Sequence, residues 1–147
     1  MNRAPLPHYA GAIVRSPGGR FLCQLRDQKK GIQFPGYWTC TPGGHVRRGE
    51  RPRRAIAREL YEEFEIKVKR LRFYRIVVER SRRTAGVYDF FTADAATEVS
   101  KLRCHEGRKA AFYFASAILR LRLHPISRRI FRTYLSGLRR VKKASRG

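Results

Sequence analysis

The chain has 147 residues and a mass of 17.1 kDa, which suits one domain built around a single core. Hydrophobic residues make up 42% of it and aromatic residues 12%, so the composition excludes an intrinsically disordered protein. Lys and Arg outnumber Asp and Glu by 34 to 11, giving a formal net charge of +23 that predicts a phosphate-bearing partner. This charge alone does not distinguish nucleotides from RNA, DNA or anionic lipid.

Three further classes of protein lack support in the sequence. The apolar runs are far shorter than the roughly 20 residues of a membrane-spanning helix, so no membrane span is predicted. Pro5 and Pro7 interrupt an N-terminus that has no secretory signal pattern, and we expect a cytoplasmic protein. The three cysteines form no Cys-x-x-Cys pair, which favours buried free thiols over disulfides or a zinc site.

Residue patterns predict alternating strands and helices. In the first half we expect strands at 8–15 and 20–26 that form a hairpin, a basic loop at 27–36, a short strand at 45–46, and a helix from Pro52 to about Phe64. In the second half we expect strands at 71–78, 87–92 and 110–114, then a helix at 126–135.

The end of the chain is strongly basic. No acidic residue follows Glu106, whereas Lys and Arg are concentrated in the last twenty residues. We expect one domain over residues 1–137 and a frayed basic tail over 138–147. Such a tail serves as solvated charge, as a weak contact for RNA or another polyanion, or as a contact for lipid or a partner protein, and composition does not choose among these.

The acidic residues are unevenly placed. Five of the eleven fall between residues 50 and 65. Helical geometry puts Glu59, Glu62 and Glu63 within an arc of about 100°, beside the apolar stripe of the same helix. Like charges this close repel each other, and a hard divalent cation such as Mg²⁺ would neutralise them. The alternative is a solvated acidic face balanced by neighbouring arginines.

The surrounding residues favour the metal site. The pattern Gly44-x5-Glu50-x7-Arg58-Glu59-Leu60-x-Glu62-Glu63-x-Glu65-Ile66 resembles the Nudix box, G-x5-E-x7-R-E-U-x-E-E-x-G-U, where U is aliphatic. Only Glu65 departs, standing where the box has glycine. Residues 38–44 resemble the W-x-x-x-P-G-G entry to the box, residues 24–38 a segment of a bacterial subgroup, and residues 102–114 the later L-x-x-x-E-G segment. On these motifs the chain is identified as a member of the Nudix superfamily, similar to small bacterial MutT-like hydrolases.

The resemblance implies a fold, a reaction and a set of site residues. The fold is of the α/β class, an α/β/α sandwich around a mixed sheet. The reaction is Mg²⁺- or Mn²⁺-dependent hydrolysis of a nucleoside diphosphate linked to another group, such as a modified (d)NTP or a nucleotide sugar. The implied metal ligands are Glu59, Glu62, Glu63 and the carbonyl of Gly44; Glu50 and Arg58 form a structural brace; Glu59, Glu62 and Glu106 are catalytic, with Glu62 or Glu106 as the general base.

Substrate contacts are expected before the box. Arg26, Lys29 and Lys30 are candidate phosphate clamps, and Tyr37 or Trp38 could stack on a base, although a solvated loop and core packing are the alternatives. Two other functions stay open: hydrolysis at a triphosphorylated RNA 5′ end, and nucleotide or RNA binding without catalysis. The sequence does not decide the oligomeric state, a homodimer included.

Two features of the predicted helix depart from good helix capping. Glu65 either adopts a left-handed conformation, which costs about 1 kcal/mol for a residue other than glycine, or lets the helix run on another turn. Arg51 offers no side-chain oxygen at the N-cap position, where one would stabilise the first turn.

Overall fold

The computed structural model describes residues 3–96 and 102–146. Within them a mixed sheet has the strand order β3-β2-β1-β6-β5, with β4 also pairing with β1 and β7 with β2. The strands are β1 (His8–Arg15), β2 (Phe21–Leu25), β3 (Trp38–Thr39), β4 (Gly43–His45), β5 (Val68–Glu79), β6 (Gly86–Ala95) and β7 (Lys109–Tyr113). Only the β1–β6 pair is parallel among these strands, and this pair forms the centre of the sheet.

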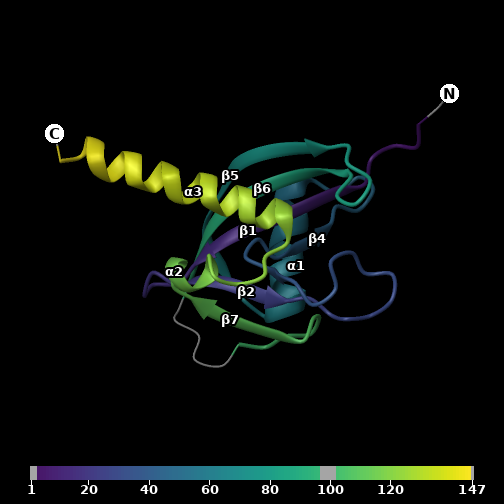
Figure 1. The fold of residues 1–147 in the computed structure, drawn as a ribbon, viewed down its shortest axis with the longest axis horizontal. Helices are drawn as coiled ribbons and strands as arrows, with labels where there is room; N and C mark the ends of the chain where they lie inside the picture. Colours follow the sequence, from purple (N-terminus) through teal and green to yellow (C-terminus); the bar gives the residue numbers. More distant parts are fainter. Residues whose placement is uncertain (1–2, 97–101, 147) are drawn as a thin grey trace.

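Helix α1 (Pro52–Phe64) covers one face of the sheet (Figure 1). Its apolar stripe is buried as expected: Ile56 and Leu60 are completely inaccessible, and Phe64 almost so. These side chains pack against residues of β1 that point to the same face, including Ala12 and Val14. Burial of this stripe holds α1 against the sheet, so the polar residues beside the stripe lie at the edge of the core.

Helix α3 (Pro125–Ala144) lies on the opposite face, preceded by the short helix α2 (Ala115–Ile118), which the sequence analysis missed (Figure 1). Ile126, Ile130 and Phe131 pack against the residues of β1 and β2 that alternate with those facing α1. The predicted α/β/α sandwich around a mixed sheet is therefore confirmed. None of the helices in the described ranges is both long and apolar enough to cross a bilayer.

The ends of α1 match the prediction. Pro52 occupies the first turn, and Arg51 makes no side-chain capping bond. At the other end Glu65 has φ 55° and ψ 31°, and its N–H donates to the carbonyl of Tyr61 at 2.9 Å. Of the two outcomes considered for Glu65, the helix therefore ends here in the left-handed conformation, which glycine adopts without strain.

The expectation of a frayed tail is wrong for most of its length. Helix α3 is continuous from Pro125 through Ala144, so residues 138–144 are helical and not frayed, while the domain boundary at residue 137 stays a prediction. The physical reason is that straight-chain Arg and Lys have high helix propensity, and Lys142 and Lys143 lie in the last turn, where cations interact favourably with the helix dipole.

The cysteines are free thiols. Cys23 and Cys40 are buried, as expected, whereas Cys104 is only partly buried. Burial raises the pKa of the Cys40 thiol to about 12 and raises that of Cys23 further. Both buried thiols therefore behave as small apolar side chains.

Candidate active site

Arg58 on α1 ties the strand-to-helix loop to the helix. Its Nε and Nη2 donate to the two oxygens of Glu50 at 2.8 and 2.9 Å, and Nη2 also donates to the carbonyl of His45 at 3.2 Å. Glu50 accepts a further bond from the backbone N–H of Arg47. The hydrogen bonds from Arg58 are the main cause that lowers the pKa of Glu50 to about 2. The structure thus brings together the two residues that the resemblance assigns to the brace.

Glu59 lies against the glycine turn at β4. A Cβ atom placed on Gly44 would come within 2.7 Å of the Glu59 carboxyl carbon, so a side chain at position 44 would displace this carboxylate. Glu59 is also held by Arg58, whose Nη1 lies 2.8 Å from its Oε1. Gly44 therefore lets the backbone of β4 approach an acidic side chain closely, which puts both within reach of one ligand.

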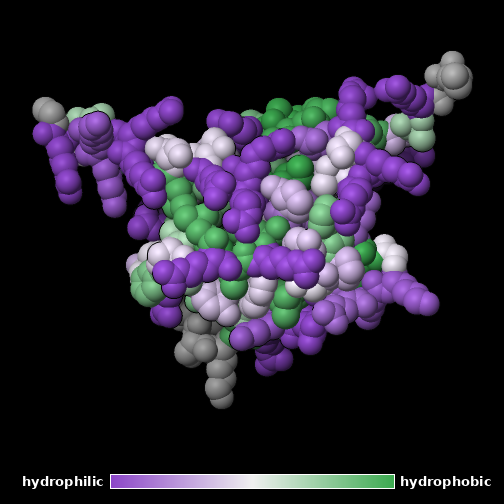
Figure 2. Space-filling view, viewed as in Figure 1, coloured by the Kyte–Doolittle hydropathy of each residue, from purple (hydrophilic) through white to green (hydrophobic). Residues whose placement is uncertain are grey.

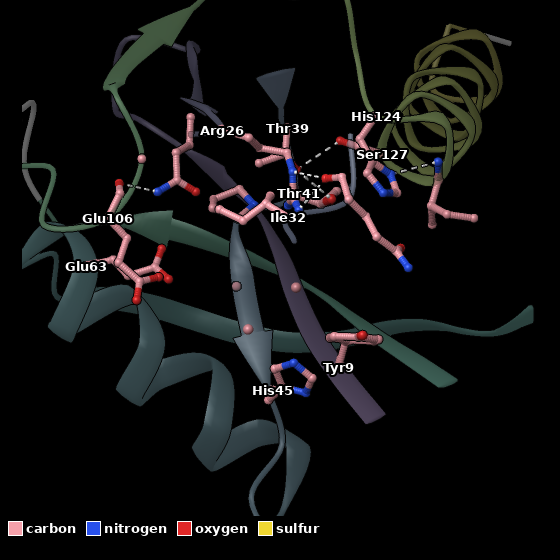
Figure 3. Close-up of a pocket in the computed structure, with 18 of the residues that line it drawn as sticks. Tyr9, Arg26, Ile32, Thr39, Thr41, His45, Glu63, Glu106, His124 and Ser127 are labelled. Carbon is pink, nitrogen blue, oxygen red and sulfur yellow. Dashed lines mark hydrogen bonds between the residues drawn. The ribbon is translucent and has the colours of Figure 1, made fainter. Parts of the chain in front are cut away.

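Glu63 and Glu106 form the acidic end of a cavity (Figure 3). Glu63 is only 4% exposed, and its Oε2 is buried without a hydrogen-bond partner among the described residues. Burial raises the pKa of the Glu63 carboxyl well above its ordinary range, and Glu106 and then Glu59 raise it further. A buried carboxyl with an unsatisfied oxygen is costly, so this arrangement favours a proton or a cation at Glu63.

Backbone and side-chain bonds hold the Glu106 loop against α1 and β2. The N–H of His105 donates to the carbonyl of Glu63 at 2.9 Å, and the side chain of Gln24 donates to the carbonyl of Glu106 at 2.7 Å. These bonds explain how an acid that lies 43 positions after Glu63 in the sequence reaches the same site.

Glu62 stands apart from this end of the cavity. Its side chain is 51% exposed, it does not line the cavity, and its Oε2 accepts from Arg58 Nη1 at 3.2 Å. Since successive helical residues are about 100° apart, the burial of Glu63 turns Glu62 outward. The structure therefore places Glu62 beside the brace rather than beside Glu106.

The donor set suits a hard divalent cation. Carboxylate and carbonyl oxygens are the ligands that Mg²⁺ prefers, and the Oε2 of Glu63 supplies one that has no partner within the described residues. Across residues 3–96 and 102–146, no three His, Cys, Asp or Glu side chains already form a group that could hold a metal. Glu59 and Glu62 are instead bonded to Arg58. The chemistry of the residues fits the cation, and Arg58 competes for two of the carboxylates.

The cavity has a volume of about 770 Å³ and extends from the acidic end across β1 and β6. Its aromatic wall holds Tyr9 and Tyr88, whose rings stack with centroids 5.1 Å apart, and His45, whose ring centroid is 4.5 Å from that of Tyr9. Tyr9 and Tyr88 face each other because they are register partners in the parallel pair. This wall offers aromatic rings to a ligand that reaches the acidic end.

The opposite side of the cavity is polar and uncharged. Thr39, Thr41 and Ser127 contribute hydroxyls, and the Ser127 Oγ accepts the N–H of Cys40 at 2.9 Å. His124 caps α3 through its Nδ1, which accepts from the N–H of Ile126. Burial lowers the pKa of His124 to about 4, so its ring is neutral near pH 7 and adds no positive charge to this side.

Of the predicted substrate contacts, Arg26 and Lys29 line the cavity and Lys30 does not. The guanidinium of Arg26 donates twice to the carbonyl of Gln33, at 3.1 and 2.8 Å. These bonds join the residue before the basic loop to a residue near the end of that loop. Lys29 is 78% exposed and lies 4.0 Å from Asp27. Two of the three basic residues expected to bind phosphate therefore lie at the cavity.

The expected stacking residues lie elsewhere. Trp38 packs edge-on against Tyr113, with centroids 5.6 Å apart, and Tyr37 is covered by the guanidinium of Arg122 at 4.1 Å. Neither Trp38 nor Tyr37 lines the cavity. For Trp38 the structure favours the alternative of core packing, because β3 places its side chain against the hydrophobic cluster beside α3. Tyr9 and Tyr88, which sequence reasoning missed, are the aromatic residues at the cavity.

Comparison with known proteins identifies the family and the fold. The family model for the NUDIX domain matches residues 5–134. The NUDIX domain of Shewanella oneidensis NrtR complexed with ADP ribose is similar in fold, with a TM-score of 0.76, 17% identity and coverage of 93% of this chain and 90% of that one. MutT from Aliivibrio salmonicida or Vibrio cholerae has a TM-score of 0.70 and 19% identity, and the match covers 91% of this chain and 99% of that one. A Burkholderia pseudomallei MutT NUDIX hydrolase has a TM-score of 0.68 and 23% identity, and the match covers 88% of this chain and 98% of that one.

A comparison with curated protein sequences gave no significant match. The family model is therefore the decisive sequence comparison, since it spans both faces of the sheet, helix α1 with its carboxylates, and the Glu106 loop. Because that match covers well over half of the length of this chain, the chain belongs to the Nudix family of hydrolases.

Proposed function

We propose that this chain hydrolyses a pyrophosphate bond in a nucleoside diphosphate linked to another group, with Mg²⁺ or Mn²⁺ as the cofactor. One observation carries the proposal: Glu63, with a buried oxygen that has no hydrogen-bond partner in the described parts of the chain, interacts with Glu106 and Glu59 at one end of a cavity of about 770 Å³. Three interacting carboxylates in a protein of net charge +23 are best explained by a cation that they bind.

The cation would be held by Glu63, Glu106 and Glu59, with the carbonyl of Gly44 as a further oxygen ligand. Glu62 accepts a hydrogen bond from Arg58, so it would bind the cation only if that bond were broken. A bound divalent cation would neutralise phosphate charge and make a water molecule more acidic. Gly44 keeps the backbone close to Glu59, and the Glu50–Arg58 brace fixes the loop that carries Gly44.

Glu106 is the better candidate for the general base. The sequence left Glu62 and Glu106 as alternatives, and only Glu106 lines the cavity. A general base must reach the water that it deprotonates, so the outward orientation of Glu62 counts against it. Arg26 and Lys29 lie where they would neutralise the remaining phosphate charge.

The aromatic wall supports a nucleoside as the organic part of the substrate. The stacked pair Tyr9 and Tyr88 offers ring surface on which a base packs favourably, and the polar side formed by Thr39, Thr41 and Ser127 offers hydrogen-bonding groups. ADP ribose, bound by the NrtR domain of similar fold, is a nucleoside diphosphate linked to a sugar and falls in the proposed class.

The test is a panel of nucleoside triphosphates, nucleotide sugars, ADP ribose and triphosphorylated RNA, each incubated with the protein in Mg²⁺ or Mn²⁺. Products are identified to show which bond breaks. We expect Glu106→Gln to lower kcat by about 10²-fold or more, the usual contribution of a general base. Asp94→Asn is the matched control, because this carboxylate lies outside the cavity and pairs with Arg70. Full activity of Glu106→Gln would contradict the assigned base, and no turnover of any compound would contradict the function.

A further inference from the structure

Helix α3 carries a continuous basic face. At 100° per residue its Lys and Arg side chains fall within an arc of about 160°, opposite the buried residues Ile126, Ile130 and Phe131. The basic residues of the helix are Arg128, Arg129, Arg132, Arg139, Arg140, Lys142 and Lys143, and Arg146 follows its last turn. The side of the helix that faces away from the sheet is therefore almost entirely cationic.

Most of these charges have no acidic partner. Arg129 pairs with Glu79 at 2.6 Å, and Arg128 donates to the carbonyl of Leu121 at 2.8 Å. From Arg132 onward, no ion pair with a carboxylate is found in the part of the chain that the structure describes. The sequence supplies no nearby acid either, because its last one is Glu106. The positive charge of α3 is therefore available to an external anion.

The second half of α3 projects beyond the sheet (Figure 1). Residues 139–146 are all exposed, and Figure 2 shows this arm covered mainly by hydrophilic side chains. A short helix without tertiary packing gains little stability of its own, and neighbouring like charges reduce it further. An anionic partner would remove that repulsion, so the arm is suited to a polyanion.

A second group of arginines lies on the sheet beneath α3. A hollow of about 190 Å³ is lined by Arg15, Arg70 and Arg72, together with Tyr134 of the helix. Arg70 pairs with Asp94 at 3.2 Å, whereas Arg15 and Arg72 are exposed without a carboxylate partner within the described ranges. The hollow lies on the sheet side of α3, under Tyr134, and is separate from the basic face, which points away from the sheet.

We propose that the basic face of α3 forms a surface that binds the phosphate backbone of a nucleic-acid strand. The partner follows from the chemistry of the surface: closely spaced cations along a helix neutralise successive phosphates without reading bases. A lipid bilayer fits less well, because an interfacial helix buries an apolar face and Val141 is the large apolar side chain exposed on this arm. The surface is distinct from the cavity and acts whatever compound is hydrolysed there.

Fluorescence anisotropy with a short labelled RNA strand of mixed sequence tests the proposal, using the full-length chain at several salt concentrations. The variant is Arg139→Gln/Arg140→Gln/Lys143→Gln, because Gln keeps helix propensity while removing charge. We expect it to bind about tenfold or more weakly near 0.1 M salt and to lower the steepness of the salt dependence by about 2, at roughly 0.7 per lost phosphate contact. Circular dichroism checks that the helix is retained.

The matched control is Arg51→Gln/Arg53→Gln/Arg54→Gln, which removes the same charge from exposed positions at the start of α1, on the other face of the sheet. The control should bind RNA nearly as tightly as the unaltered protein. Equal weakening of both variants would show that diffuse net charge, and not this surface, binds the strand. Absence of RNA binding would also overturn the proposal, whether or not the protein co-sediments with vesicles of phosphatidylserine and phosphatidylcholine.

Discussion

Glu63→Gln is expected to stabilise the metal-free protein while weakening its response to Mg²⁺. The carboxyl of Glu63 is 4% exposed, and one of its oxygens lacks a hydrogen-bond partner among the described residues. Burial is the largest cause that raises its pKa from 4.5 to about 9, followed by Glu106 and Glu59. Near neutral pH the folded protein must therefore hold a proton at this site that the unfolded chain releases.

The size of the effect follows from linkage. A carboxyl with a raised folded pKa contributes its full stability below the unfolded value, and this contribution is lost as the pH rises through the folded pKa. At pH 7 the unfolded pKa lies about 2.5 units below the pH, which at about 1.4 kcal/mol per unit sets a limit of roughly 3 kcal/mol. At about pH 5 the same reasoning sets the limit on the lost stability below roughly 1 kcal/mol. Gln needs no proton, so we expect it to add about 1–3 kcal/mol near pH 7.

Urea unfolding in EDTA at both pH values measures this difference, and a repeat with Mg²⁺ measures the cation. Mg²⁺ should stabilise the unaltered protein more than Glu63→Gln, because a ligand raises stability only in proportion to its binding to the folded state. Glu62→Gln is the control, since it removes a carboxylate from the neighbouring position of the same helix, where the side chain is half exposed and lies outside the cavity. A Glu63→Gln variant that is less stable than the unaltered protein at both pH values refutes the argument from burial.

Three further substitutions test other parts of the site. Gly44→Ala places a Cβ about 2.7 Å from the Glu59 carboxyl carbon, so we expect kcat to fall more than about tenfold, with the melting temperature shifting by only a few degrees; unchanged kinetics would contradict this. Arg58→Lys loses the two-pronged bond to Glu50 and should cost about 1–3 kcal/mol in denaturant unfolding. Tyr9→Ala should raise KM with little change in kcat if the ring binds the nucleoside, and a selective fall in kcat would argue otherwise.

Local sequence signals predicted the elements that hold the acidic residues. Pro52 and the spacing of Ile56, Leu60 and Phe64 predicted the start, the buried side and the end of α1, because each of these depends on neighbours one or two turns away. The brace was predicted from the resemblance to the Nudix box, in which Glu50 and Arg58 are separated by only eight positions. Such short-range features are visible in one sequence.

Features that depend on distant pairing were not accessible in this way. Tyr9 and Tyr88 meet because β1 and β6 are parallel neighbours, and nothing in either strand specifies that register. Trp38 was a candidate for stacking on a base, but its side chain packs against Tyr113 of β7. The length of α3 was underestimated because its second half lacks the buried stripe by which a helix is recognised.

Arg58 links the structural brace to the proposed metal site. Its guanidinium contacts Glu50, Glu59 and Glu62, so one positive charge is shared by three carboxylates before Glu63 and Glu106 are counted. The contacts with Glu50 use both of its carboxylate oxygens and are the hardest to break. Glu62, in contrast, is half exposed and accepts one bond from Arg58 at 3.2 Å. A cation that takes up Glu59 would therefore leave the brace intact while releasing part of Arg58. The acidic cluster keeps a surplus of negative charge inside a strongly basic protein, and this surplus is what a divalent ion would neutralise.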